Sequence, residues 1–149
     1  MRIYIDTSVV GGYYDKEFEE PTRELFEKVE SGEFILIVSE LLQAELLRAP
    51  EYVRNHLDKY SKNQIQRVEL TEDAKKLADL YIAEQVVGAT SKADCQHIAI
   101  ATINKVDVLV SWNFKHIVNL KRIRGYNSVN LKNNFAILEI RTPKEILEL

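Results

Sequence analysis

Three acidic side chains and one amide are the residues in this sequence whose types and positions suggest chemistry. Asp6 ends an apolar run, Glu45 interrupts an apolar stretch, Asp94 stands in the first turn of a helical pattern, and Asn113 follows a second apolar run. Carboxylates gathered in one place repel one another unless a cation lies between them. Oxygen ligands suit Mg²⁺ or Mn²⁺ better than zinc, and Mg²⁺ held in this way can bind a phosphate oxygen. The pattern therefore favours metal-dependent hydrolysis of a phosphodiester.

Each of these residues also has an ordinary structural explanation. Asp6 could cap the turn that follows it, and Glu45 could lie on the polar face of a helix. Asp94 fits a capping box that begins at Ser91, and Asn113 is a common turn residue. The two interpretations differ in whether the fold brings all four side chains to the same place.

The elements that would have to position them alternate between strand and helix. Strands are predicted at residues 3–5, 34–38, 66–70, 106–110 and 135–139. Helices are predicted at 21–29, 40–48, 51–62, 71–87 and 91–104, with a last helical turn from Thr142. Ser39 and Thr71 are the expected N-caps, Gly88 is an expected helix end, and 112–119 is expected to be a loop. No element is assigned to residues 120–134.

Strands that alternate with helices predict a parallel sheet covered on both faces. In open sheets of this kind, ligands bind beyond the carboxyl ends of the strands. Asp6 directly follows one predicted strand, Asn113 lies just past the end of another, and Glu45 lies on the helix that follows a third. We therefore expect these residues to meet at one edge of the sheet.

Composition sets the broad class of protein. The chain has 149 residues, 46% hydrophobic and 29% charged, with a formal net charge of -3. These values predict one globular domain over residues 1–149 and argue against a uniformly basic nucleic-acid binder. The single cysteine, Cys95, fits a reducing compartment and is expected to be a small buried hydrophobe. With no apolar run long enough to span a bilayer and no signal-peptide pattern, we expect a cytoplasmic protein.

Four short segments resemble the PIN-domain family, the metal-dependent ribonucleases that include the toxins of VapBC-type toxin–antitoxin pairs. They are residues 3–8, 39–45, 93–101 and 109–114, in the family's order. The resemblance implies a three-layer α/β/α fold around a mainly parallel sheet of order 3-2-1-4-5. It also implies that Asp6, Glu45 and Asp94 bind Mg²⁺ or Mn²⁺ for ribonuclease activity.

The resemblance assigns roles to neighbouring residues as well. Thr7, Ser8 and Ser111 would orient a ligand or a metal-bound water. Asn113 matches a fourth position that is frequently Asp in the family. An amide supplies an oxygen but no charge, so metal affinity should fall and a two-metal site becomes less favoured.

Basic side chains near the expected site are candidates for holding RNA through its phosphates. They are Lys92, Lys115, His116 and Arg122. The alternative is a solvated polar surface, with His116 as a turn histidine. Trp112, Phe114, Tyr13 and Tyr14 could stack on bases, although burial in a core is the more common fate of aromatic residues. His56 and His97 receive no role.

The expected partners are an RNA substrate, an antitoxin protein and a second copy of the chain in a homodimer. The apolar face of Leu25, Phe26 and Val29 could serve the core, a dimer or an antitoxin. The competing function is a catalytically weak or inactive PIN-like module that binds nucleic acid or acts as a scaffold. A phosphatase of the haloacid-dehalogenase type needs a second Asp two residues after Asp6, where this chain has Ser8.

Overall fold

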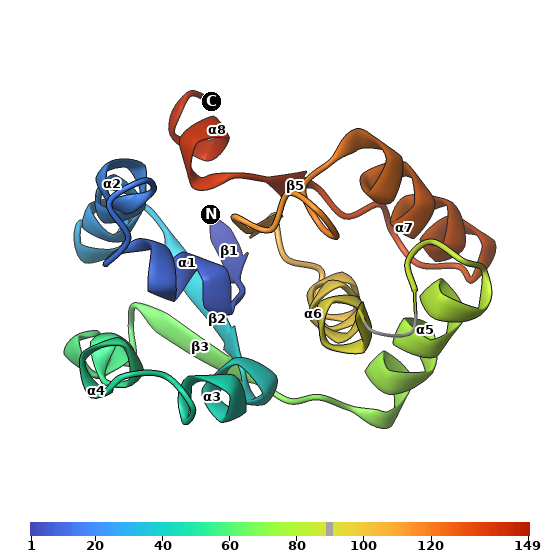
Figure 1. Cartoon of the computed structure of the whole chain (residues 1–149), viewed down its shortest axis with the longest axis horizontal. Helices are drawn as coiled ribbons and strands as arrows, with labels where there is room; N and C mark the ends of the chain where they lie inside the picture. The colour runs from blue at the N-terminus through green and yellow to red at the C-terminus, as the bar shows by residue number, and fades with distance from the viewer. Residues whose placement is uncertain (89–90) are drawn as a thin grey trace.

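The computed structural model describes residues 1–88 and 91–149, and its centre is a parallel sheet of five strands (Figure 1). The strands are β1 (Arg2–Ile5), β2 (Ile35–Ser39), β3 (Ile65–Val68), β4 (Val108–Val110) and β5 (Ile140–Arg141). Their order across the sheet is β3-β2-β1-β4-β5, and each neighbouring pair runs parallel. The predicted sheet order is confirmed.

Helices cover both faces of this sheet. They are α1 (Thr7–Gly12), α2 (Glu19–Glu30), α3 (Glu40–Leu46), α4 (Glu51–Arg54), the 3-10 helix η1 (His56–Lys59), α5 (Glu72–Ala83), α6 (Lys92–Ile103), α7 (Leu120–Lys132) and α8 (Pro143–Leu147). In Figure 1, α5, α6 and α7 lie to the right of the strands, and α1, α2 and α4 lie to the left. The predicted three-layer α/β/α arrangement is confirmed. None of the helices in the described part of the chain has the length and apolar character needed to cross a bilayer.

Strand β1 shows why both faces need cover. Ile3 and Ile5 point into the apolar cluster on the α2 side, whereas Tyr4 points into the cluster on the α6 side. All three side chains are completely buried. Alternate residues of a strand point to opposite faces, so a central parallel strand must be apolar throughout. The apolar face of α2 packs into the first cluster, which supports the core alternative for that face.

The helix caps decide how the chain leaves the strands. Ser39 ends β2 and its hydroxyl accepts a hydrogen bond from the Leu42 amide, so α3 begins directly at the edge of the sheet. Thr71 caps α5 in the same way. Both predicted caps are confirmed. The alternative explanation of Asp94, a capping box that begins at Ser91, is wrong, because Ser91 makes no side-chain cap and its buried hydroxyl has no hydrogen-bond partner among the described residues.

Several predicted boundaries are also wrong. Helix α5 ends at Ala83 because Gln85 adopts a left-handed conformation with φ of 60°, so the helix stops before Gly88. The predicted helix 51–62 divides into α4 and η1. The last strand lies at 140–141 instead of 135–139. Within 135–139, the Asn127 side chain accepts a hydrogen bond from the backbone amide of Leu138 and donates one to its backbone carbonyl. A side chain of α7 therefore satisfies backbone groups that a neighbouring strand would otherwise bond.

Candidate active site

Asp6 lies at the carboxyl end of β1, where its side chain is 4% exposed. It does not cap α1 with its carboxylate. Instead, Ser8 Oγ donates to Oδ1 and Ser111 Oγ donates to Oδ2, each over 2.6 Å. Burial raises the pKa of Asp6 above its usual range, although His97 and the two serine hydroxyls act in the opposite direction. The chain therefore confines a carboxylate in a place that disfavours its charge.

Glu45 projects from α3, the helix that follows β2. Its Oε1 accepts a hydrogen bond of 2.8 Å from Thr7 Oγ1 and lies 2.5 Å from His97 Nε2. Burial alone would raise the pKa of Glu45, but the hydrogen bonds and the charge of His97 outweigh it, so this pKa is lowered. Folding therefore favours the ionised form of Glu45.

His97 is held from its other side by β1. Its Nδ1 lies 2.6 Å from the Tyr4 hydroxyl, and that hydroxyl donates to Ser39 Oγ over 2.8 Å. His97 and Tyr4 are both buried. A continuous set of contacts thus runs from the N-cap of α3 through β1 and α6 to the Glu45 carboxylate. It fixes the position of that side chain.

Asp94 lies half-buried in the first turn of α6, and its contacts are looser. Its Oδ1 accepts a long hydrogen bond of 3.3 Å from Asn113 Nδ2. Asn113 is itself fixed by its loop, because its amide donates to Ser111 Oγ and its Oδ1 accepts from the His116 amide. Burial raises the pKa of Asp94, His116 opposes this, and the negative charges of Asp6 and Glu45 raise it further. The three carboxylates are therefore electrostatic neighbours.

The donor chemistry of this cluster fits a hard divalent cation, since the side chains offer oxygen and one positive ion would relieve the repulsion acting on Asp94. Within residues 1–88 and 91–149, however, no three Asp, Glu, His or Cys side chains lie close enough together to hold a metal ion. The Glu45 oxygen that bonds Thr7 and His97 is already engaged. The assignment of Asp6, Glu45 and Asp94 as metal ligands stays a prediction.

The basic residues predicted to hold RNA have three kinds of surroundings. Lys92 and Lys115 are exposed, near Asp94 and Asn113 in the chain, and neither forms an ion pair within the described residues. His116 is half-buried, and its Nδ1 has no hydrogen-bond partner among those residues. Arg122 donates instead to the backbone carbonyl of Val86, which gives it a structural role.

His97 is the residue that sequence analysis missed. Its signal was its position three residues after Asp94, which places both side chains on one face of α6.

The aromatic residues that could stack on bases differ in exposure. Trp112 is mostly buried, Tyr13 and Tyr14 pack against the core, and Phe114 is 52% exposed. Cys95 is completely buried, as predicted.

Residues 3–116 match the family model of the PIN domain. The chain belongs to the PIN-domain family. The match covers β1 through the Asn113 loop, and so includes all four residues of the site. PIN domains are generally nucleases, so family membership supports a nuclease for this chain as well.

A solved structure with the same fold is the crystal structure of VapBC2 from Rickettsia felis bound to a DNA fragment from their promoter. The TM-score is 0.59 at 13% sequence identity, over 95% of this PIN domain and 98% of that chain. At this identity the likeness shows the fold alone. No curated protein matches the sequence.

Proposed function

We propose that this PIN domain is an endoribonuclease that depends on Mg²⁺ or Mn²⁺. The observation that carries the proposal is the electrostatic proximity of three carboxylates: the charges of Asp6 and Glu45 act on Asp94, and Asn113 donates a hydrogen bond to Asp94. Folding raises the pKa of Asp6 and Asp94, and their mutual repulsion is part of the cause for Asp94. Clustered carboxylates with this electrostatic cost are typical of functional sites.

The chain's own residues have distinct tasks in this proposal. Ser8 and Ser111 fix Asp6, so that its two oxygens point in set directions. Thr7 fixes Glu45 through a hydrogen bond, and His97, with a smaller contribution from Thr7, lowers the pKa of Glu45. In this proposal, the three hydroxyls orient the ligands through these hydrogen bonds.

The reaction is hydrolysis of a phosphodiester. A water oxygen adds to phosphorus, the bond from phosphorus to the 3′ oxygen breaks, and the products are a 5′-phosphate and a 3′-hydroxyl. A divalent cation bound by Asp6, Glu45 and Asp94 would supply acidification of water and polarisation of the phosphoryl oxygen. The flanking phosphates would be held by Lys92, Lys115 and His116, the last of which lies beside Asp94. Phosphate contacts of this kind do not depend on the RNA sequence and weaken as salt rises. Arg122 contributes less, because its guanidinium bonds Val86.

The likeness to a chain of the VapBC2 complex supports a toxin–antitoxin setting, and we propose a cytoplasmic location for it. In this setting the protein would be a toxin ribonuclease with an antitoxin partner, and the PIN domain would form a homodimer. The single buried cysteine fits a reducing compartment.

A second candidate is a PIN domain that binds nucleic acid or acts as a scaffold with weak or no catalysis. Two observations favour it. Asn113 lacks the charge that an aspartate would bring, and no three potential ligands in the described residues lie within reach of one metal ion. Metal titration separates the candidates, since a ligand of the native state raises its melting temperature.

The decisive experiment compares Asp6→Asn and Asp94→Asn with Asp79→Asn, which changes an exposed aspartate on α5. The parent and Asp79→Asn should cleave single-stranded RNA in Mn²⁺, with EDTA stopping both. The two site variants should lose cleavage and the Mn²⁺-induced rise in melting temperature while keeping the parent's circular dichroism spectrum. Site variants that cleave at the parent's rate would contradict the proposal. A parent that binds RNA without cutting it would favour the second candidate.

A further inference from the structure

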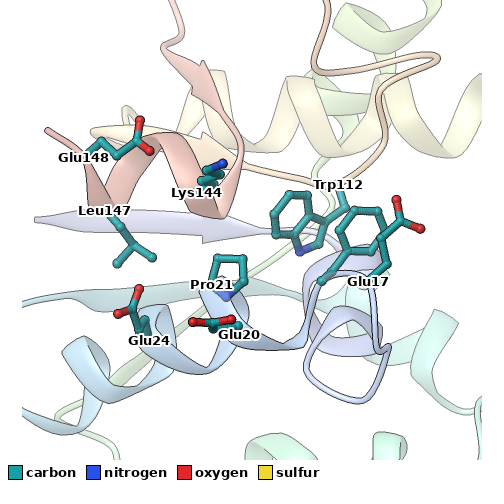
Figure 2. Close-up of a pocket in the computed structure, with 9 residues that line it drawn as sticks. Glu17, Glu20, Pro21, Glu24, Trp112, Lys144, Leu147 and Glu148 are labelled. Carbon is teal, nitrogen blue, oxygen red and sulfur yellow. The ribbon is translucent and has the colours of Figure 1, made fainter.

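A cavity of about 640 Å³ lies between α2 and α8, and part of its lining is Trp112, the residue between Ser111 and Asn113 of the candidate active site (Figure 2). Apolar side chains supply part of its lining: Phe18, Pro21, Trp112 and Leu147. The rings of Phe18 and Trp112 are stacked, with centroids 4.4 Å apart. Cavities of this size with aromatic lining are typical of ligand-binding sites.

The charged part of the lining is strongly acidic. It consists of four glutamates, Glu17, Glu20, Glu24 and Glu148, and one lysine, Lys144. Figure 2 shows these side chains around the apolar lining. None of the five takes part in an ion pair within the described part of the chain. Such a surface repels phosphates and attracts cations.

The hollow continues along α2. A neighbouring cavity of about 510 Å³ shares Glu24 and Leu147 with the first and adds Glu27, Ser31 and the ion pair between Lys28 and Glu33 to its lining. Two adjoining cavities along one helix form an elongated groove, which a single metal ion or a compact molecule would leave mostly empty. Helix α2 has 12 residues and is therefore about 18 Å long, a length that about five residues of extended chain span.

We propose that this acidic groove binds an arginine-containing segment of a partner protein. A guanidinium stacks on aromatic rings and forms paired hydrogen bonds with carboxylates, so it matches both parts of the lining at once. An aliphatic residue between two arginines would contact Leu147, and the arginines would meet the glutamates on either side. The partner is identified by this chemistry alone, and the inference does not depend on nuclease activity.

The groove has a built-in reporter and a structural link to the active site. Trp112 is the only tryptophan in the chain, so its fluorescence reports on the cavity it lines. Its backbone amide donates to Ser8 Oγ, which in turn donates to Asp6. A segment bound in the groove therefore touches a residue whose main chain supports the proposed metal ligand.

The test titrates the full chain with the peptide acetyl-Gly-Arg-Leu-Arg-Gly-amide while Trp112 fluorescence and binding heat are followed. Saturable binding is expected, with affinity that falls as salt rises. The double variant Glu20→Gln/Glu24→Gln should weaken binding about fivefold, given the modest strength of exposed charge pairs. The matched control Glu51→Gln/Glu69→Gln removes two exposed glutamates elsewhere and should change the affinity by less than about twofold.

Leu147→Ala gives an independent check of the apolar part of the groove. It removes a half-buried side chain and should weaken binding about threefold, with the parent's spectrum retained. A peptide with glutamate in place of both arginines should not bind.

Four results would overturn the proposal: no saturable binding, equal weakening in both double variants, displacement of the peptide by a single-stranded RNA, or concentration-dependent self-association that Glu20→Gln/Glu24→Gln abolishes. The third result would assign the groove to nucleic acid, and the fourth to a second copy of this chain.

Discussion

Glu45 and Asp94 come from helices next to β2 and β4, the two strands that flank β1, but their surroundings differ. Glu45 has a short contact to His97, and its pKa is lowered. Asp94 has a hydrogen bond of 3.3 Å to Asn113, and its pKa is raised. The surroundings of Glu45 thus stabilise its ionised carboxylate, whereas burial and neighbouring negative charges destabilise the ionised carboxylate of Asp94. In the proposed nuclease, the Glu45 side is preorganised and the Asp94 side is the one that a cation would relieve.

The largest expected effect comes from breaking the Glu45 side. His97→Ala would leave a cavity and would remove one of the two partners of Glu45 and one of the two partners of the buried Tyr4 hydroxyl. We expect a loss of about 3 kcal/mol in the free energy of unfolding, measured by urea denaturation. His116→Ala, on the Asp94 side, should cost less than about 1 kcal/mol. Equal losses in the two variants would remove the contrast between the sides.

The next effect concerns Asp6, which follows the central strand β1 and so lies between the Glu45 side and the Asp94 side of the site. Ser8→Ala and Ser111→Ala each remove one hydrogen bond of 2.6 Å to its carboxylate. Each should cost about 1.5 kcal/mol in the free energy of unfolding at pH 7, because hydrogen bonds to a charged group are the stronger ones. In an Asp6→Asn background the same changes should cost less than half as much. Unchanged costs in that background would mean that the serines support the loop and not the carboxylate.

Opposite pH dependences should separate Glu45 from Asp94 in the presence of EDTA. The pKa of Glu45 is lowered from 4.5, so its stabilisation is present above that pH and is lost as pH falls through the folded pKa. The pKa of Asp94 is raised from 3.8, so stability is greatest below that pH and is lost as pH rises through the folded pKa.

At pH 7, Glu45→Gln should therefore lose about 1 kcal/mol, and Asp94→Asn should melt at or above the parent temperature. Both differences should shrink at pH 3.5. Thermal melts across this pH range measure them, and a loss of stability in Asp94→Asn at pH 7 would contradict the assignment.

The contrast between the two sides also separates what the sequence could predict from what it could not. The predicted position of Asp6 needed only local information, because an apolar run followed by a polar residue marks a strand and its end. His97 needed tertiary information, since its role depends on Tyr4 and Glu45, which are distant in the chain. The spacing of three residues from Asp94 places His97 on the same face of α6, but that spacing does not distinguish a histidine bonded to a carboxylate from one packed in a core.

Helix α7 was missed for a related reason. Its sequence contains a glycine and two asparagines, which are poor helix formers. A Cβ on Gly125 would lie 2.7 Å from a Val86 methyl, so the glycine permits close packing against the segment after α5. Asn130 is buried and accepts a hydrogen bond from the Tyr81 hydroxyl. These residues lower the helix propensity of the segment, which the sequence shows, and they make tertiary contacts that stabilise the helix, which the sequence does not show.

The smallest expected effect tests whether the Asp94 side is tuned for a cation. Asn113→Asp replaces an amide donor with a further negative charge next to Asp94. In EDTA it should cost about 0.5 kcal/mol, because like charges repel near a protein surface. In Mn²⁺ the order should reverse, with a larger rise in melting temperature than in the parent, since added charge strengthens a hard-cation site. Asn63→Asp adds the same charge at an exposed position and should show neither effect. If Asn113→Asp behaved like Asn63→Asp in both buffers, the proposal that the negative charge around Asp94 binds a cation would fail. The inactive binding module would then be the better description of this site.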